Sequence, residues 1–425
     1  MRVELITIGD ELLLGLTIDT NAAHLARELA GIGVAVMRHA TVGDDAAAIA
    51  AAVRDALDRT GAVITTGGLG PTSDDKTRPA IAELFGRDLV FDEERWEALR
   101  AMWRERGRGE VPEANRGQVM IPRGATVLTN RHGTAPGIWI EDERGRWCAM
   151  LPGVPREMRG MLADELLPRL ARRGAGEPRV VRSRTLRTTG VAESRLPDLL
   201  GPLADGVDGL PLAYLPSPDG IDLRVTARDL SPDDADAFLA RAIERLRERV
   251  TRYAYAEGRT DLAEVVLAAC SERGLRLAVA ESCTGGLLGA RLTAIPGSSA
   301  VVLGGVIAYS NAVKLELLGV SPETLERHGA VSQEVASEMA TGARRRIGAE
   351  IGVAITGVAG PGGGTPEKPV GLVWIAADVA GLVRTHGSRF IGDRAEIRFR
   401  STQAALDIVR RMLSGETNSA ASAER

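Results

Sequence analysis

Strand-like and helix-like segments alternate along residues 1–170, and this alternation constrains the fold more than any other feature of the chain. Short runs rich in Val and Ile are each followed by a longer segment with apolar residues at helical spacing. The segments lie at 3–8, 21–31, 34–38, 45–60, 62–66 and 78–85. Because parallel strands need crossover connections, the pattern predicts a parallel sheet with helices on both faces.

A second alternation of the same kind runs from 258 to 415, and the stretch between the two differs from both. Residues 171–257 combine strand-like runs, proline- and glycine-rich turns and one charged amphipathic helix, which is typical of a small α+β domain. Residues 416–425 are small and polar without periodicity, so we expect a disordered tail. We therefore predict the α/β fold class: two separate α/β domains with mainly parallel sheets, at 1–170 and 258–415, joined by a small α+β domain.

Charge and cysteine content exclude several classes of protein. The 53 basic and 57 acidic residues are interspersed and give a net charge of −4, which leaves no general footprint for nucleic acid or anionic lipid. No apolar run is long enough to cross a membrane, and the amino-terminal residues read as a strand, not as a signal peptide. Three scattered cysteines are too few for a disulfide framework or a zinc cluster. We therefore expect a cytoplasmic protein with reduced thiols.

Ser282 lies on a turn between an apolar strand at 275–280 and a helix that begins near 287. A hydroxyl at such a turn is exposed at the carboxyl edge of a sheet, beside backbone N–H groups, but it needs a base to become a nucleophile. Lys314, after the strand at 301–309, is a candidate base because a helix start favours its neutral form, and Tyr309 is placed to assist it. Taken singly, Ser282 also suits a helix cap and Lys314 a solvated lysine. Cys283 is the rival nucleophile.

A glycine-rich loop follows the apolar strand at 351–356, and four of its residues between 360 and 364 are glycine. Glycines let a backbone approach an anionic ligand such as a phosphate closely. The loop is not a Walker A motif, because it lacks the Gly-Lys-Ser/Thr ending that opens a helix. By itself such a loop is weak support for a site.

Two acidic pairs follow two separate strands of the first domain. Asp10 and Glu11 come after the first strand, and Asp74 and Asp75 follow a Gly-Gly-Leu-Gly-Pro turn after another. Loops at the carboxyl edge of a parallel sheet converge on one crevice, so the pairs together predict a divalent ion of the Mg, Mn or Co type that bridges phosphates. Helix capping is the alternative, and it is strongest for the first pair. His132, in a nearby loop, is by itself more typical of a surface residue.

The carboxyl-terminal motifs resemble the CinA carboxyl-terminal domain. They are Ala-Glu-Ser-Cys-Thr-Gly-Gly, Ile-Ala-Tyr-Ser-Asn-Ala-Val-Lys, His-Gly-Ala-Val-Ser and Thr-Gly-Val-Ala-Gly-Pro-Gly-Gly-Gly-Thr-Pro-Glu-Lys-Pro-Val-Gly, in this order over about 260–413. The resemblance implies a nicotinamide mononucleotide deamidase without a cofactor, in which Ser282 attacks, Lys314 takes the proton and Tyr309 assists. It places substrate contacts at Cys283, Thr284, Gly285, Gly286, Thr356, Gly357, Gly360, Gly362 and Gly363, with N–H groups of 283–286 on the oxyanion. Arg394 is our candidate for the phosphate, and Arg398 is the competing choice.

The amino-terminal motifs resemble the molybdopterin-binding-like domain of CinA over about 1–170. They are Ile-Gly-Asp-Glu-Leu-Leu, Asp-Thr-Asn, Thr-Gly-Gly-Leu-Gly-Pro-Thr-Ser-Asp-Asp-Lys-Thr-Arg, Asn-Arg-His-Gly-Thr-Ala-Pro-Gly and Leu-Pro-Gly-Val-Pro-Arg-Glu-Met. The resemblance implies metal-dependent hydrolysis of ADP-ribose to AMP and ribose 5-phosphate. Its implied metal site holds Asp10, Glu11, Asp74 and Asp75, with Asp75 also catalytic, and its ligand contacts are Asn21, Gly67, Gly68, Asn130 and Thr134.

The two resemblances together predict a bifunctional hydrolase of pyridine-nucleotide salvage that acts on nicotinamide mononucleotide and ADP-ribose. They also imply a homodimer. A non-catalytic nucleotide-binding scaffold linked to competence or DNA damage is an alternative of another class. A molybdopterin-handling amino-terminal domain is a third, because kinship of fold does not choose between chemistries.

Overall fold

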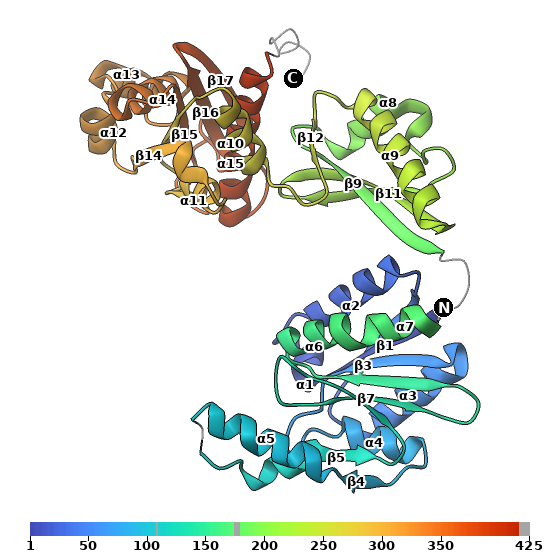
Figure 1. Ribbon diagram of the computed structural model, residues 1–425. Helices are drawn as coiled ribbons and strands as arrows, with labels where there is room; N and C mark the ends of the chain where they lie inside the picture. Colours follow the sequence, from blue (N-terminus) through green and yellow to red (C-terminus); the bar gives the residue numbers. More distant parts are fainter. Residues whose placement is uncertain (108, 174–178, 416–425) are drawn as a thin grey trace. The chain divides into compact units, whose positions relative to one another are not determined.

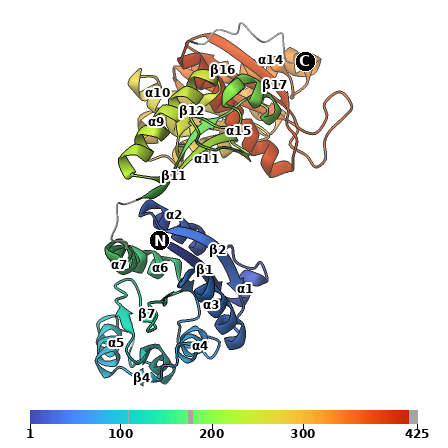
Figure 2. The ribbon, with the colours of Figure 1, turned by 90° about the vertical axis from the view of Figure 1, so that its right-hand side faces the viewer.

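The computed structural model describes residues 1–107, 109–173 and 179–415. The tail at 416–425, which we predicted to be disordered, lies outside the described residues. The chain divides into two compact units: residues 1–182 with 227–238, and residues 183–226 with 239–425. Figure 1 and Figure 2 show the helices and strands of both units.

A six-stranded sheet forms the centre of the amino-terminal domain, in the order β2-β1-β3-β8-β7-β6. The first four strands of this order pair in parallel, and β7 and β6 are antiparallel additions. The predicted parallel sheet is therefore confirmed for its central strands. The strands are β1 (Arg2–Ile8), β2 (Ala35–Val42), β3 (Ala62–Thr66), β6 (Thr126–Leu128), β7 (Gly137–Glu141) and β8 (Trp147–Leu151).

Helices cover both faces of this sheet, as the alternation predicted (Figure 1). Successive side chains of a strand point to opposite faces, so Leu5 packs in one core cluster and Ile6 in the other. One face is covered by α2 (Thr20–Gly31), α6 (Pro155–Met161) and α7 (Leu167–Arg173), and the other by α3 (Ala46–Thr60) and α4 (Thr77–Leu84). The remaining elements are α1 (Asp10–Leu13), α5 (Glu93–Glu105) and the strand pair β4 (Leu89–Phe91) and β5 (Met120–Pro122).

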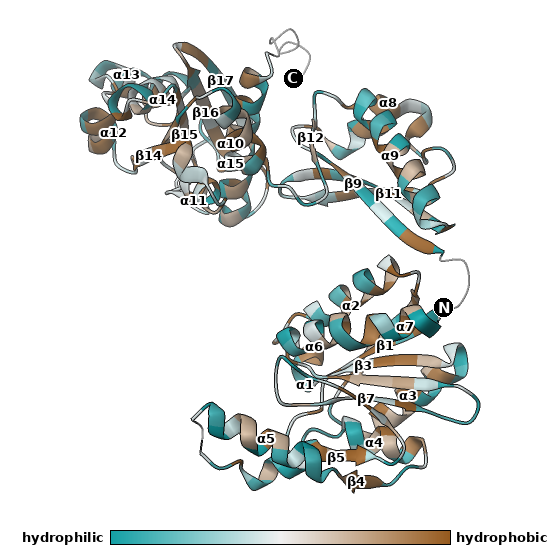
Figure 3. Ribbon diagram, in the orientation of Figure 1, coloured by the Kyte–Doolittle hydropathy of each residue, from teal (hydrophilic) through white to brown (hydrophobic). Residues whose placement is uncertain are grey.

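A four-stranded sheet in the order β10-β11-β9-β12 forms the small α+β domain. Its strands are β9 (Val180–Thr188), β10 (Leu212–Ser217), β11 (Gly220–Leu230) and β12 (Ala254–Glu257), and its helices are α8 (Leu196–Leu200) and α9 (Pro232–Arg249). Helix α9 carries both teal and brown residues in Figure 3, as an amphipathic helix that packs one face on a core must.

The carboxyl-terminal sheet has five strands in the order β14-β13-β15-β16-β17, and it corrects one part of our prediction. Only β13 with β14 and β13 with β15 are parallel pairs, whereas β16 and β17 pair antiparallel. The turn between β16 and β17 is a two-residue hairpin with Ala380 and Gly381 at positive φ, which joins antiparallel strands only. The strands are β13 (Leu277–Glu281), β14 (Val302–Ile307), β15 (Ile351–Gly357), β16 (Leu372–Val379) and β17 (Leu382–Arg389).

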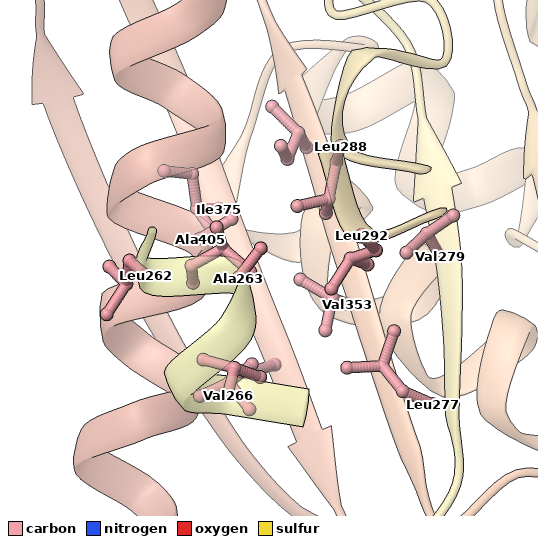
Figure 4. Packing of buried hydrophobic residues seen from close by; sticks show 14 of the residues in the cluster. Leu262, Ala263, Val266, Leu277, Val279, Leu288, Leu292, Val353, Ile375 and Ala405 are labelled. Carbon is pink, nitrogen blue, oxygen red and sulfur yellow. The ribbon is translucent and has the colours of Figure 1, made fainter. Parts of the chain in front are cut away.

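Two layers of helices enclose this sheet. One core cluster lies under α10 (Leu262–Glu272), α11 (Leu287–Thr293) and α15 (Arg394–Leu413), and Figure 4 shows Val279 and Val353 of the strands against Leu288 and Leu292 of α11. The opposite face is covered by α12 (Asn311–Leu318), α13 (Pro322–His328) and α14 (Gln333–Ile347). Among the described residues, no helix is long and apolar enough to cross a membrane.

Candidate functional site

The carboxyl ends of β13, β14 and β15 bring the predicted nucleophile, base and glycine loop to one edge of the sheet. These three strands run parallel, so the residues that follow them meet at the same edge. Ser282 follows β13, Lys314 lies in the helix after β14, and Thr356 is the last residue but one of β15. The helix that carries Lys314 is capped by Ser310, whose hydroxyl accepts the N–H of Val313 at 3.3 Å.

The Lys314 side chain reaches Ser282 from inside the domain. Its Nζ donates to Ser282 Oγ at 3.1 Å and to the carbonyl oxygen of Ala308 at 2.7 Å, and the residue is 1% exposed. Burial lowers the pKa of Lys314, because an ammonium loses its hydration there. We had attributed a neutral amine to the helix dipole, but desolvation is the main cause. An amine held by one carbonyl has a lone pair free to accept the serine proton.

Cys283, the rival nucleophile, points into the hydrophobic core. Its side chain belongs to the cluster under α10, α11 and α15 and is 7% exposed. Burial raises the pKa of the Cys283 thiol to about 11, so the thiol stays protonated at neutral pH. A protonated, enclosed thiol is a poor nucleophile, and the structure favours Ser282 over its neighbour.

Glu281 is a residue of the site that our sequence reasoning missed. Its buried carboxylate accepts the backbone N–H groups of Gly286 at 3.1 Å, Leu288 at 3.0 Å and Gly289 at 2.8 Å. An acid next to a Gly-Gly helix start is the signal that could have identified it. Within the nucleophile turn, which we define as residues 282–286, the N–H of Gly285 also donates, to Ser282 O at 3.1 Å.

The candidate oxyanion donors are therefore fewer than the four N–H groups that we predicted at 283–286. The N–H of Gly286 already donates to the Glu281 carboxylate, and the N–H of Gly285 already donates to the carbonyl oxygen of Ser282. In the described part of the chain, the N–H groups of Cys283 and Thr284 have no backbone or side-chain acceptor from another residue. Thr284 is fully buried whereas Cys283 is 7% exposed, so the N–H of Cys283 remains as the candidate for a developing oxyanion.

Two arginines at the start of α15 face the nucleophile turn and the glycine loop in different ways. Arg398 donates to the carbonyl oxygen of Thr284 from Nε at 3.2 Å and from Nη2 at 2.5 Å, so its guanidinium holds the turn. Arg394 is exposed and donates to Gly360 O at 2.7 Å and to the Tyr309 hydroxyl at 3.3 Å. Of the two phosphate candidates, Arg394 thus keeps a side open to a ligand.

Tyr309 is not joined to the serine and the lysine in the described structure. Tyr309 is 64% exposed, and its hydroxyl accepts a hydrogen bond from Arg394. In the described structure, no direct contact therefore supports the expected proton relay from Tyr309. Its place beside Arg394 fits a role in orienting that arginine.

The glycine loop is anchored at its ends and open in its middle. Thr356 donates its hydroxyl to Ala330 O at 2.7 Å, and Lys368 Nζ donates to His328 O at 2.5 Å. A Cβ atom at Gly362 or Gly363 would meet nothing within 4 Å, so free space borders the loop there. A ligand has room to approach this backbone closely.

In the amino-terminal domain, Asn21 lies where the ends of two strands meet. Its Nδ2 donates to Thr66 Oγ1 at 3.2 Å and to Gly153 O at 2.7 Å, and these residues follow or end β3 and β8. Its buried Oδ1 has no partner in the described chain. A buried amide oxygen without a donor costs stability unless a ligand or water supplies one, so this atom fits the predicted ligand contact. Gly67, with φ of 114°, lies against the carbonyl of Ile8 at the end of β1, where no side chain fits.

The acidic residues of this domain do not form one cluster. Asp10 and Asp44 exchange backbone bonds, from Asp44 N to Asp10 Oδ1 at 3.2 Å and from Asp10 N to Asp44 Oδ2 at 3.0 Å. Asp75 instead accepts Gly70 N at 2.7 Å and Thr72 N at 2.8 Å, so both of its oxygens hold the glycine turn. Among the residues that the structure describes, no group of three or more His, Cys, Asp or Glu side chains is placed to hold a metal ion.

These contacts allow a test of whether the acids fit the predicted metal. Mg²⁺-type ions commonly use one or two carboxylates and complete their shell with water and substrate phosphates. Asp10 and Asp44, each with one oxygen outside the reciprocal pair, fit such a site. Asp75 fits less well because its oxygens already accept N–H groups, and Asp74 and Glu11 are exposed beside these turns.

The loop that contains Asn130 is held by its own side chains. Asn130 Nδ2 donates to Ala135 O at 2.8 Å and to Glu157 Oε2 at 2.5 Å, while its Oδ1 accepts the N–H of His132. His132 Nε2 lies 3.0 Å from Asp164 Oδ2, and this ring lines an open groove of about 680 Å³. Thr134, in the same loop, is half-buried. Asn130 thus stabilises the loop. Both polar atoms of its amide already have partners there, so the amide group is not free for the predicted contact with a ligand.

Three family models match successive parts of the chain. Residues 4–172 match the model described as "Probable molybdopterin binding domain", residues 183–256 match the "Damage-inducible protein CinA KH domain", and residues 259–413 match the "CinA C-terminal domain".

Similar proteins extend over the whole chain. The CinA-like protein of Gemmatimonas aurantiaca is 60% identical over 416 residues, which cover 98% of this chain and 97% of the relative. The CinA-like protein of Chlorobaculum tepidum is 45% identical over 415 residues, 96% of this chain and 97% of the relative. Among solved structures, the competence/damage inducible protein CihA of Agrobacterium tumefaciens is 46% identical; the match covers 36% of this chain and 93% of that one, with a TM-score of 0.35. With this identity along nearly its full length, the chain belongs to the CinA family.

Proposed function

We propose that the carboxyl-terminal domain hydrolyses the carboxamide of nicotinamide mononucleotide to nicotinate mononucleotide and ammonia. The observation that carries the proposal is the buried Lys314 Nζ at 3.1 Å from Ser282 Oγ. Burial lowers the pKa of Lys314 and so favours the neutral amine, which is the form that can act as a base for a serine. The activity that the CinA resemblance implies needs such a pair and no metal.

In the proposed reaction, Ser282 Oγ attacks the carboxamide carbon while its proton moves to Lys314 Nζ. The N–H group of Cys283 stabilises the oxyanion, and such a donor is usually worth about 3–4 kcal/mol. The C–N bond then breaks as Lys314 returns the proton to the leaving nitrogen, which departs as ammonia. Water hydrolyses the resulting ester by the same route, with Lys314 again as the base.

Substrate binding in this proposal uses the open side of the site. The Arg394 guanidinium, held by Gly360 O and the Tyr309 hydroxyl, supplies a charged fork for the 5′-phosphate. The free space along Gly362 and Gly363 accommodates the ribose phosphate next to the backbone.

The experiment that tests this function measures ammonia and nicotinate mononucleotide from purified protein in the presence of a chelator. We expect Ser282→Ala to abolish product formation without a change in melting temperature. Ser337→Ala is the matched control, because that half-buried serine of α14 donates to its own helix and lies outside the site. Full activity of Ser282→Ala would refute the assigned nucleophile.

We propose a second activity for the amino-terminal domain, the metal-dependent hydrolysis of ADP-ribose to AMP and ribose 5-phosphate. Two observations favour a ligand site there: the unpartnered Oδ1 of Asn21 and the reciprocal pair of Asp10 and Asp44 at the same sheet edge. A divalent ion bound there would neutralise charge that develops on the diphosphate. In this proposal Asp10 and Asp44 hold the ion, and Asp75 fixes the turn that approaches the phosphates.

The second activity is tested by AMP formation from ADP-ribose with Mg²⁺, Mn²⁺ or Co²⁺ and with a chelator. AMP that appears only with a metal ion would support it, and no AMP with any ion would refute it. A rise in melting temperature with molybdopterin but not with ADP-ribose would favour the molybdopterin-handling alternative. Protein that binds both nucleotides and converts neither would favour the scaffold alternative. The homodimer that the resemblance implies is tested by light scattering.

A further inference from the structure

We propose that Glu281 is a positioning residue of the deamidase site, whose carboxylate fixes the nucleophile turn so that the N–H group of Cys283 remains free for the oxyanion. The inference rests on the proposed deamidase function and adds to it a residue that does not itself contact the substrate. Glu281 directly precedes the nucleophile, at the end of β13.

Helix α11 has no side-chain cap at its own cap position. A helix begins with N–H groups that have no partner in the helix, and a side-chain oxygen at the cap position usually accepts them. The residue at the cap of α11 is Gly286, with φ of 95°, which has no side chain to offer. Glu281 supplies the acceptor from the preceding strand instead, since its two oxygens accept the N–H groups of Gly286, Leu288 and Gly289.

The Glu281 carboxylate is also buried. Glu281 is 1% exposed, and a charged group is kept in such a place only when it is well paired. Three N–H donors at 2.8–3.1 Å supply that pairing, and bonds to an ionised acceptor are among the strong ones. The Glu281 carboxylate and its three N–H donors, which we call the clamp, therefore form a firmly held arrangement.

Hydrogen bonds to other elements fix the rest of the nucleophile turn. Ser282 N donates to Ile355 O at 2.9 Å on the neighbouring strand, and Arg398 holds the carbonyl oxygen of Thr284. Glu281 fixes the far end of the turn at Gly286. With both ends and one carbonyl held, the turn that carries the N–H group of Cys283 is fixed before the substrate arrives, as an oxyanion site requires.

Glu281 is not placed to act as an acid or base itself. Its oxygens face backbone donors, and Ser282 Oγ is bonded to Lys314 Nζ. If the carboxylate only stabilised the fold, its loss would lower stability and leave turnover per folded molecule unchanged. If it sets the oxyanion donor, its loss lowers kcat far more than it changes KM.

The test compares Glu281→Gln with Asp378→Asn. Asp378 serves as the control because its carboxylate is also 1% exposed and also accepts a backbone N–H, from Gly381 at 2.8 Å; it differs from Glu281 in having Arg344 Nε 2.9 Å from its Oδ2. It pairs with Gly352 across the sheet, at the end of β15 opposite to the site. We expect Glu281→Gln to lower kcat for ammonia release by about 100-fold or more, the usual effect of a lost oxyanion donor, with KM within about threefold. Asp378→Asn should keep kcat within about threefold even where its melting temperature falls. Equal losses of kcat in the two variants, or an unchanged kcat in Glu281→Gln, would overturn the proposal.

Hydrogen exchange separates this inference from the proposed substrate. In Glu281→Gln we expect faster exchange at the amides of Gly286, Leu288 and Gly289, with no change at the amides of β15. If the wild-type protein releases no ammonia from nicotinamide mononucleotide while these amides respond, the proposed function fails and the clamp stands. Unchanged exchange at the three amides would overturn the clamp whatever the substrate.

Discussion

The titration of Lys314 predicts a link between the stability of its domain and the pH dependence of the reaction. The perturbation is Lys314→Met, which keeps an unbranched side chain and removes the amine. In the unfolded chain a lysine has a pKa near about 10.4. In the folded domain the residue is 1% exposed, and burial lowers its pKa.

The sign follows from the protons bound in each state. Between the lowered pKa and about 10.4, the unfolded chain binds one more proton than the folded one, so the wild-type free energy of unfolding rises with pH by about 1.4 kcal/mol per unit. Below the lowered pKa both states are protonated, the slope vanishes and the destabilisation is complete. Methionine carries no proton, so the advantage of Lys314→Met over wild type is largest at low pH and decreases through this window. The lost hydrogen bond to Ala308 O adds a cost of about 1–2 kcal/mol that does not vary with pH.

The assay follows urea unfolding of both proteins between pH 6 and about 10.5 by hydrogen exchange at the β13 and β15 amides, which report on this domain. In parallel, kcat/KM for ammonia release is measured over the same range. The base must be neutral, so kcat/KM should rise with pH and level off above the lowered pKa. The pH at which the stability slope begins and the midpoint of the kinetic rise should then coincide. A slope without a matching rise, or a rise that Lys314→Met retains, would refute Lys314 as the base.

Three further predictions concern other residues of the two sites. Cys283→Ala should keep ammonia release within about threefold of wild type, because burial holds the pKa of this thiol at about 11; loss of release would restore the cysteine as the nucleophile. Arg394→Met should raise KM for nicotinamide mononucleotide by about tenfold or more with little change in kcat, whereas Arg398→Met should lower kcat, since that guanidinium holds the nucleophile turn; the reverse pattern in steady-state kinetics would exchange their roles. Asp75→Ala should lower the melting temperature of the amino-terminal domain because the glycine turn loses its acceptor, while Asp10→Asn should weaken the thermal shift caused by Mn²⁺; an unchanged melting temperature in the first or an unchanged shift in the second would contradict the assigned role.

The sequence allowed the fold class and the meeting of Ser282 with Lys314 to be predicted, because both follow from the order of strands and helices. Residues after parallel strands share an edge whatever the details of the loops. The antiparallel end of the second sheet could not be predicted in this way. Its last strand, Leu382–Arg389, is mostly exposed or half-buried and polar, so it lacks the apolar run by which the other strands were recognised.

Contacts made by backbone atoms were beyond the reach of sequence patterns. Glu281 and Asp75 both act on N–H groups of a neighbouring turn, and nothing in the spacing of side chains distinguishes such a carboxylate from a metal ligand. We predicted Asp75 as a ligand and did not notice Glu281. The difference is set by which carboxylate oxygens already accept N–H groups of the turn, and that depends on the folded backbone.

The choice between Ser282 and Cys283 shows how the fold sorts two adjacent nucleophiles. The Cys283 side chain lies in the core under α10, α11 and α15, whereas Ser282 Oγ meets Lys314 of α12, which lies on the other face of the sheet. The same turn thus raises the pKa of the thiol by burial and presents the hydroxyl to a base whose own pKa burial lowers. Exchanging the two side chains would place the more reactive sulfur beside the lysine, so the double variant Ser282→Cys with Cys283→Ser should be labelled by iodoacetamide at residue 282. Labelling no faster than that of the wild-type thiol would show that the lysine does not activate the group at this position.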